Sequence, residues 1–250
     1  MAGCVSIDRI ISKLDEHLGK NDYAAAERHL LYWISEAESG CDTRGELTLR
    51  NELMGLYRKL GRKDEAFAAA HSAVSKINSL GIESSVSAAT TYLNTATVYK
   101  AFSKAEEGFH HFEKARDIYE RELEPTDSRL GGLYNNMGLS LVDMRRFDEA
   151  NELYRKAISI MQGHEDGAPE VAITYLNMAT AAEAESGLVD ADEKIQRYLD
   201  IAEEMLENYP ARDGYYAFVC EKCASVFGYY GRFFYESELL ERARRIYEGS

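Results

Sequence analysis

Side-chain amides recur at a nearly fixed interval along the middle of the chain. Asn94, Asn136 and Asn177 are separated by 42 and 41 residues, and each lies two positions before a small residue. An asparagine side chain carries both a donor and an acceptor, so it can pair with the backbone of an extended peptide whatever the peptide's side chains are. It can equally hydrogen-bond to a neighbouring part of its own chain. The spacing therefore predicts either a row of peptide-binding groups or a row of structural bonds, and one residue can do both.

The cysteines and histidines are the residues that could hold a metal or carry redox chemistry. Cys220 and Cys223 form a single Cys-x-x-Cys pair inside an expected helix, whereas a structural zinc site needs a second pair. Cys223 occupies an apolar helix position, which favours a buried thiol. His110 and His111 are adjacent on an expected helix, so their side chains point in different directions. We therefore expect no metal and no cofactor.

The sequence motifs of common active sites are missing. There is no glycine-rich phosphate loop, no His-Glu-x-x-His pair and no Gly-x-Ser-x-Gly turn. None of the many carboxylates stands in an apolar context that would raise its pKa. The sequence therefore predicts a protein that is not an enzyme.

The amides belong to a repeated unit of two helices. In residues 150–158 the apolar or small positions are 150, 153, 154, 157 and 158, which is the stripe of an amphipathic helix. Gly138 and Ala150 lie twelve residues apart where two such helices would cross, and small side chains there let the backbones approach closely. The same offset recurs in the neighbouring units, in Ala96 with Gly108 and in Ala179 with Ala191.

This unit resembles the tetratricopeptide repeat (TPR), in the long variety of roughly 42 residues found in the kinesin light chain. The resemblance rests on the consensus positions occupied by Gly138, Leu141, Ala150, Tyr154 and Ala157, and in the preceding unit by Ala96, Tyr99, Phe112 and Ala115. It implies stacked helical hairpins. It also implies that the asparagine of each first helix pairs with the backbone of a bound peptide.

About six such hairpins account for the whole chain. We expect an all-α fold, a right-handed α-solenoid that forms a single superhelical domain over residues 1–250. The predicted hairpins cover residues 3–39, 43–80, 83–124, 127–162, 168–208 and 212–248. The last hairpin departs from the pattern, because Glu236 stands where the other second helices have alanine or glycine.

Charge and cysteine usage restrict the partners and the compartment. With 29 basic and 43 acidic residues the net charge is −14, so nucleic acid and anionic membranes are poor partners. Residues 1–18 hold no apolar run long enough for a signal peptide or a membrane span. The cysteines show no disulfide framework, so we expect reduced thiols and a cytoplasmic protein; they are Cys4, Cys41, Cys220 and Cys223.

The faces of the first helices that point away from the hairpin crossing would line a concave groove. The predicted groove residues are Arg58, Asn94, Thr97, Lys100, Asn135, Asn136, Asn177, Thr180 and Glu183. Arg58 and Lys100 would make one part of the groove basic, and Glu183 would make another acidic. A bound segment would then carry an acidic end and a basic end; the alternative is that these charges are solvated and unpaired.

The sequence thus predicts a non-catalytic module that binds a peptide or helical segment of another protein in the groove. One alternative is a homo-oligomeric scaffold, a homodimer assembled through the aromatic last hairpin, with its residues Tyr229, Tyr230, Phe233, Phe234 and Tyr235. Another alternative is a groove-based sensor of a small molecule or peptide. The aromatic rings could also simply fill the last space between helices.

Overall fold

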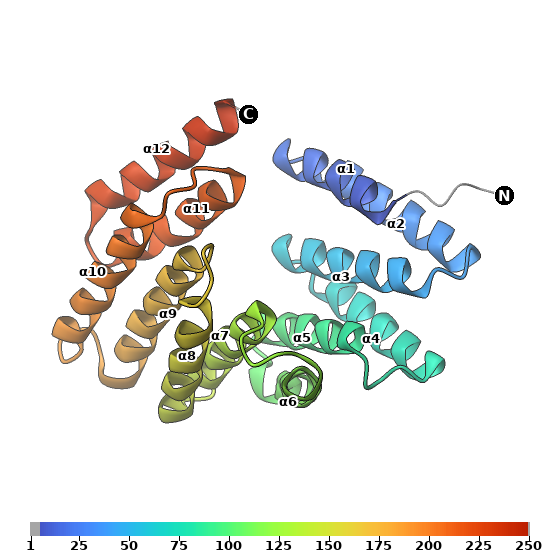
Figure 1. Ribbon diagram of the computed structural model, residues 1–250, viewed down its shortest axis with the longest axis horizontal. Coiled ribbons are helices and arrows are strands. Elements are labelled where there is room, and N and C mark those ends of the chain that lie inside the picture. Colours follow the sequence, from blue (N-terminus) through green and yellow to red (C-terminus); the bar gives the residue numbers. More distant parts are fainter. Residues whose placement is uncertain (1–5, 250) are drawn as a thin grey trace. The chain divides into compact units, whose positions relative to one another are not determined.

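The computed structural model describes residues 6–249, and within them the chain forms twelve α-helices and no strand (Figure 1). The all-α fold of helical hairpins predicted from the sequence is confirmed. Cys4 and the first positions of the predicted 3–39 hairpin lie outside the described residues. The helices are α1 (Ile7–Gly19), α2 (Tyr23–Ser39), α3 (Thr43–Lys59), α4 (Lys63–Leu80), α5 (Val86–Ala101), α6 (Ala105–Glu122), α7 (Ser128–Asp143), α8 (Phe147–Met161), α9 (Ala168–Ser186), α10 (Asp192–Asn208), α11 (Gly214–Tyr229) and α12 (Phe233–Gly249).

Most hairpins are closed by the same tight turn. One residue of the turn has a left-handed backbone, with φ between 54° and 85°, and these residues are Asn21, Gly61, Ser103, Arg145 and Gly231. The next residue then donates its N–H to a carbonyl of the first helix, as Arg146 does to Leu141 over 2.8 Å. This closure satisfies carbonyls that the helix end would leave unpaired. Because the turn recurs, the second helix leaves the first in the same way in these hairpins.

In the α5–α6 and α7–α8 hairpins the two helices approach each other closely at a glycine. A Cβ atom placed on Gly138 of α7 would lie 2.5 Å from Cε1 of Tyr154 of α8. Gly108 of α6 lies in the same way against the side chain of Tyr99 of α5. The small residue predicted at the crossing is therefore required, although the group that occupies the space over Gly138 is an aromatic ring. Ala150, its predicted partner, is also fully buried.

The departure at Glu236 is compensated within its own hairpin. The carboxylate of Glu236 on α12 lies over Gly228 on α11, where any Cβ atom would collide with it. The large side chain thus stands on the second helix, and the small residue is on the first helix. Because protein interiors are close-packed, the crossing limits the combined volume of the two side chains that meet there, and a larger one on one helix requires a smaller one on the other.

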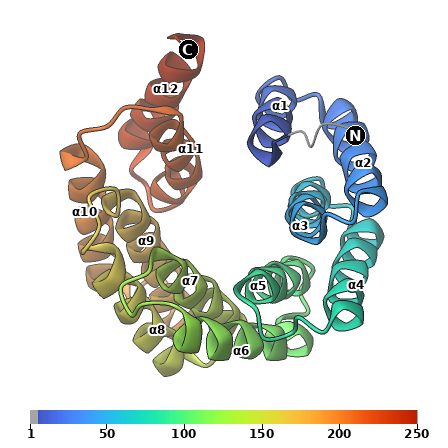
Figure 2. The same cartoon turned by 45° about the vertical axis from the view of Figure 1, so that its right-hand side comes forward.

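Contacts divide the chain into two compact units, residues 1–122 and 123–250, and each has its own hydrophobic core. Residues such as Ile10, Leu30 and Ala70 form the core of the first unit, and Leu176, Leu199, Tyr216, Phe227 and Leu239 belong to that of the second. Within the first unit α3 contacts α5, and within the second α9 contacts both α7 and α11 (Figure 2). Within each unit these first helices are therefore neighbours. The single superhelical domain over residues 1–250 stays a prediction.

Candidate partner-binding surface

A hydrogen bond between two asparagines joins neighbouring first helices of the second unit. Nδ2 of Asn177 on α9 donates to Oδ1 of Asn135 on α7 over 2.9 Å. Asn135 is only 7% exposed, so its acceptor would otherwise be a buried polar group without a partner, which is costly. The bond therefore supports the stacking of the two hairpins.

The first unit has the same arrangement. Nδ2 of Asn94 on α5 donates to Oδ1 of Asn51 on α3 over 3.0 Å. Nδ2 of Asn51 donates in turn to Oγ1 of Thr91 over 3.1 Å and to the Leu47 carbonyl over 2.9 Å. Asn51 is not among the amides predicted from the sequence. Its distance of 43 residues from Asn94 is the signal that could have found it.

Each predicted amide keeps an acceptor after making its structural bond. Asn136 donates from Nδ2 to the carbonyl of Gly132 in its own helix over 2.8 Å. Asn94, Asn136 and Asn177 are half-buried, and within residues 6–249 no donor reaches Oδ1 of any of them. The structural bonds are therefore present, and these acceptors could still take a backbone N–H from a partner.

The other predicted groove residues differ in their accessibility. Thr97 is 8% exposed and donates to the Asn94 carbonyl over 2.7 Å, so its hydroxyl is used within the helix. Thr180 is exposed and donates to Leu176 of its own helix. Lys100 is half-buried and already has an interaction within the chain. Arg58 is exposed, and burial of part of its guanidinium lowers its pKa.

A polar pocket of about 610 Å³, here called the asparagine pocket, lies beside the amides of the second unit. Asn135 and Asn136 line it together with charged side chains of both signs, which are Arg129, Lys222, Glu165, Asp166 and Glu170. The hydroxyl of Tyr215 on α11 donates to the carboxylate of Glu170 on α9. Lys222 forms no ion pair with any residue that the structure describes. The pocket can therefore supply an amide, a cation and an aromatic ring to one ligand.

Helix α11 also contributes to this surface, and none of its residues was among the groove residues predicted from the sequence. Tyr215 is 38% exposed, Phe218 is 53% exposed, and Lys222 is also exposed. Their spacing of three and four residues places them on one face of the helix. No asparagine marks α11, because the last hairpin departs from the repeat pattern; the exposed apolar residues at helical spacing were the available signal.

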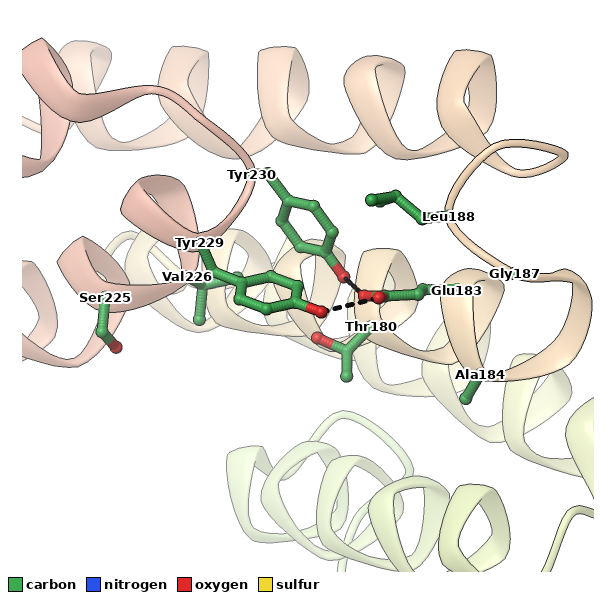
Figure 3. Close-up of a pocket in the computed structure, with 9 residues that line it drawn as sticks. All are labelled: Thr180, Glu183, Ala184, Gly187, Leu188, Ser225, Val226, Tyr229 and Tyr230. Carbon is green, nitrogen blue, oxygen red and sulfur yellow. Dashed lines mark hydrogen bonds between the residues drawn. The ribbon is translucent and has the colours of Figure 1, made fainter.

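A second pocket, here called the tyrosine pocket, lies at the other end of the contact between α9 and α11 and has a volume of about 590 Å³ (Figure 3). Tyr229 donates its hydroxyl to Oε1 of Glu183 over 2.7 Å, and Tyr230 donates to Oε2 over 2.8 Å. Glu183 was expected to make this part of the groove acidic. It is half-buried and accepts a hydrogen bond from each of two phenols of the next hairpin, whose rings lie on the same side of it (Figure 3).

The aromatic residues that were grouped as one dimer surface divide into two sets. Tyr235 is 8% exposed, its ring packs edge-on against Phe227 with centroids 4.7 Å apart, and its hydroxyl donates to Glu207 over 2.7 Å. Tyr230 is also partly buried against the core. These two rings fill the space between helices. Tyr229, Phe233 and Phe234 remain exposed, by 68%, 66% and 96%.

The cysteine pair is part of the core of the second unit. Cys220 and Cys223 are both free and buried. Burial raises the pKa of both thiols, that of Cys223 to about 12. A protonated, buried thiol is a poor nucleophile and a poor metal ligand. Within residues 6–249 no group of three or more His, Cys, Asp or Glu side chains is placed to hold a metal ion.

Comparison with protein families identifies the repeat. Residues 87–163 match the model of the tetratricopeptide repeat. The two hairpins within this range, α5–α6 and α7–α8, are of the TPR type. They match over the part of the chain where the spacing of small residues is most regular, and the predicted resemblance is confirmed. TPR units generally mediate binding between proteins and are generally not catalytic.

Solved structures share the TPR-like fold. The crystal structure of BtubC (BKLC) from P. vanneervenii is similar, with a TM-score of 0.68, 22% identity, and coverage of 82% of this chain and 83% of that chain. A putative kinesin light chain of Podosopora anserina with nearly identical TPR-like repeats gives a TM-score of 0.54 at 17% identity, covering 80% of this chain and 94% of that one. No curated protein matches in sequence. None of the helices in residues 6–249 is both long and apolar enough to span a membrane.

Proposed function

We propose that this chain is a non-catalytic module that binds a peptide or helical segment of another protein. In the second unit the segment would lie along the face formed by the first helices α7, α9 and α11. The equivalent face of the first unit carries Asn51 and Asn94 on α3 and α5. The proposal includes a cytoplasmic location, as expected from the free thiols of Cys41, Cys220 and Cys223.

The observation that carries this proposal is the Oδ1 of Asn136, a half-buried amide that lines the asparagine pocket and whose oxygen accepts from no donor of residues 6–249. Asn136 is held by its bond to Gly132, so little side-chain entropy would be lost when Oδ1 accepts a bond from a partner. Such an acceptor recognises backbone N–H groups, which every peptide has. This supports a surface on which the amides bind the backbone of the partner segment and the two pockets bind its side chains.

The residues of α11 add features that interfaces commonly use. Tyr215 and Phe218 expose aromatic surface next to the cation of Lys222. Aromatic side chains are enriched where proteins bind one another, because they bury a large area with few rotatable bonds. The surface would therefore favour a segment that offers an apolar residue to these rings.

The test selects peptides from a random-sequence display library on the full chain and measures the dissociation constants of the selected peptides by calorimetry. Asn136→Ala should weaken binding about tenfold, the loss expected for one buried hydrogen bond of roughly 1.4 kcal/mol. Asn151→Ala on the second helix α8 is the matched control, because it removes an amide that lines neither pocket. Equal loss in both variants, or no selected peptide, would contradict the proposal.

A second candidate is a homodimer through the exposed rings of the last hairpin. Phe233 and Phe234 begin α12 and are 66% and 96% exposed, and Tyr229 adds a third ring. Burying such rings in a dimer would remove apolar surface from water. Tyr230 and Tyr235, which the sequence analysis included, are used inside the chain and are left out of this surface.

Sedimentation velocity over a range of protein concentrations decides this second candidate. The dimer proposal expects a second species that disappears in the double variant Phe233→Ser with Phe234→Ser. A purely monomeric chain at the highest soluble concentration would contradict it. Melting temperature should change little in the double variant, because neither ring is buried.

A further inference from the structure

The tyrosine pocket is built around one carboxylate. Glu183 of α9 accepts a hydrogen bond on each of its oxygens, from Tyr229 and from Tyr230 at the end of α11 (Figure 3). The two rings stand almost perpendicular, with an interplanar angle of 80° and centroids 4.9 Å apart. The carboxylate is thus fixed in position, and ring surface lies on one side of it.

The charge of this carboxylate is not balanced inside the pocket. Of the nine residues that line it, Glu183 is the only acid, and none is lysine, arginine or histidine. No ion pair connects Glu183 to any cation of residues 6–249. Phenol hydroxyls donate hydrogen bonds but bring no positive charge. The pocket therefore carries a net negative charge on a fixed group.

The two tyrosines stay neutral beside this carboxylate. The hydrogen bond from Tyr229 to Glu183 raises the Tyr229 pKa, and burial together with Glu183 raises that of Tyr230. A neutral phenol presents an electron-rich ring face, which attracts cations within about 6 Å of the ring centre. The ring faces and the carboxylate would therefore both attract the positive charge of one ligand.

The rest of the lining is mostly apolar. Leu188 is half exposed beside the pocket, and Val226 and Ala184 complete an aliphatic wall. Such a wall suits the methylene stem of a long side chain, which can lie on apolar surface while its charged end reaches a polar partner. A small hydrated metal ion would gain nothing from this wall.

We propose that the tyrosine pocket binds an alkylammonium group, as carried by a lysine side chain. The ammonium would lie against Glu183 and the faces of Tyr229 and Tyr230, and its aliphatic stem would contact Leu188 and Val226. The inference rests on the proposed function in that the lysine would belong to the bound segment.

The chain offers a matched control on the same helix. Glu170 also accepts a tyrosine hydroxyl, from Tyr215, at the opposite end of the contact between α9 and α11. The asparagine pocket that it lines holds the cations Arg129 and Lys222 and the further acids Glu165 and Asp166, and it shares no residue with the tyrosine pocket. Removing the charge of Glu170 therefore changes a tyrosine-bonded carboxylate at a separate place and leaves the tyrosine pocket intact.

The experiment titrates the full chain with butylammonium and with butanol while the ring signals of Tyr229 and Tyr230 are followed by NMR on protein with labelled tyrosine. Butylammonium should shift these signals saturably, and butanol should shift them far less. Glu183→Gln keeps the shape; its Oε1 can accept one phenol hydroxyl, and its Nε2–H can donate to the oxygen of the other phenol. The variant should weaken butylammonium binding about tenfold, as loss of a charged hydrogen-bond partner does. Glu170→Gln should leave it unchanged.

Equal binding of butylammonium and butanol, or unchanged binding in Glu183→Gln, would overturn the inference. If Glu183→Gln fails to fold, the comparison of the two probes on the unsubstituted chain still decides. The probe is not a peptide, so the result is separable from the proposed function. A chain that binds butylammonium but no peptide contradicts the function alone, and one that binds peptides through Asn136 but not butylammonium contradicts this inference alone.

Discussion

The ring of Tyr154 covers Gly138, and its hydroxyl has no hydrogen-bond partner in the part of the chain that the structure describes. The side chain of Tyr154 is fully buried, and burial raises its pKa. The ring therefore fills a space that only a glycine leaves open, while its polar atom is buried without compensation. Both halves of this relationship can be tested separately.

Gly138→Ala should destabilise the second unit. The added Cβ would lie 2.5 Å from the Tyr154 ring, and the buried ring cannot move away without disturbing the core, so we expect a loss of ~1–3 kcal/mol. Thermal unfolding of the full chain measures it. Gly132→Ala on the same helix is the control, because a Cβ there meets nothing within 4 Å; it should be neutral or stabilising by about 0.5–1 kcal/mol. Equal melting temperatures for the two variants would mean that the crossing is not tight at Gly138.

Tyr154→Phe should leave the free energy of unfolding unchanged or raise it by up to about 1 kcal/mol. The change keeps the ring over Gly138 and removes a buried hydroxyl that lacks a partner. Tyr119→Phe serves for comparison, because the Tyr119 hydroxyl lies 2.7 Å from Oγ1 of Thr90, and its loss should cost about 1 kcal/mol. Urea unfolding of both variants decides; a larger loss for Tyr154→Phe than for Tyr119→Phe would refute this view of the site.

Asn135 and Asn177 should be energetically coupled. Their hydrogen bond of 2.9 Å joins α7 to α9, so Ala substitution of either residue removes the same bond. In a double-mutant cycle the coupling should be about 0.5–1.5 kcal/mol. The pair Asn136 and Asn177 has no such bond and should show coupling near zero. Additive effects at Asn135 and Asn177 would show that the bond contributes nothing to stacking.

Stability should fall as the pH is lowered from 6.5 to 4 because of His111. The ring is 8% exposed, stacks on Tyr92, and has no partner for Nδ1 among the described residues. Burial, with His110, Lys114 and His71 adding to it, lowers the pKa of His111 from 6.5 to about 4. Between pH 6.5 and 4, His111 therefore binds a proton in the unfolded chain but not in the folded chain. The free energy of unfolding decreases by roughly 3 kcal/mol in total over this interval.

His111→Leu tests this pH dependence. The variant should have a free energy of unfolding that falls less steeply between pH 6.5 and 4, and the difference between the two curves isolates His111 from the carboxylates that both proteins share. Parallel curves would mean that His111 protonates freely in the folded chain.

Much of the fold could be predicted because each hairpin is encoded locally. The interval between Asn94 and Asn136, the helical stripe of residues 150–158 and the small residue Gly138 are all properties of contiguous sequence. They predict helix, turn and crossing point without knowledge of distant residues. The exchange of sizes between Glu236 and Gly228 could not be predicted in this way, since a single sequence does not show which residue compensates for which.

The candidate site was predicted only in part. The positions of Asn94, Asn136 and Asn177 on the first helices follow from periodicity, but the hydrogen bonds that these amides make depend on the exact stacking of successive hairpins. The sequence pairs Asn136 with Asn177 by spacing, whereas the structure bonds Asn177 to Asn135. A shift of one residue turns a helical side chain by about 100°, and only the packed helices decide which side chain faces the neighbour.

The sequence by itself determined the repeat, because the pattern of small and apolar residues needed for each hairpin lies within about 40 contiguous residues. Only the tertiary structure decided the surroundings of Glu183. Its two phenol donors come from residues 46 and 47 positions later in the chain, in a hairpin that no longer follows the pattern. Hydrogen bonds of this kind depend on side-chain atoms meeting to within a few tenths of an ångström, and that precision arises only when α9 and α11 are packed together.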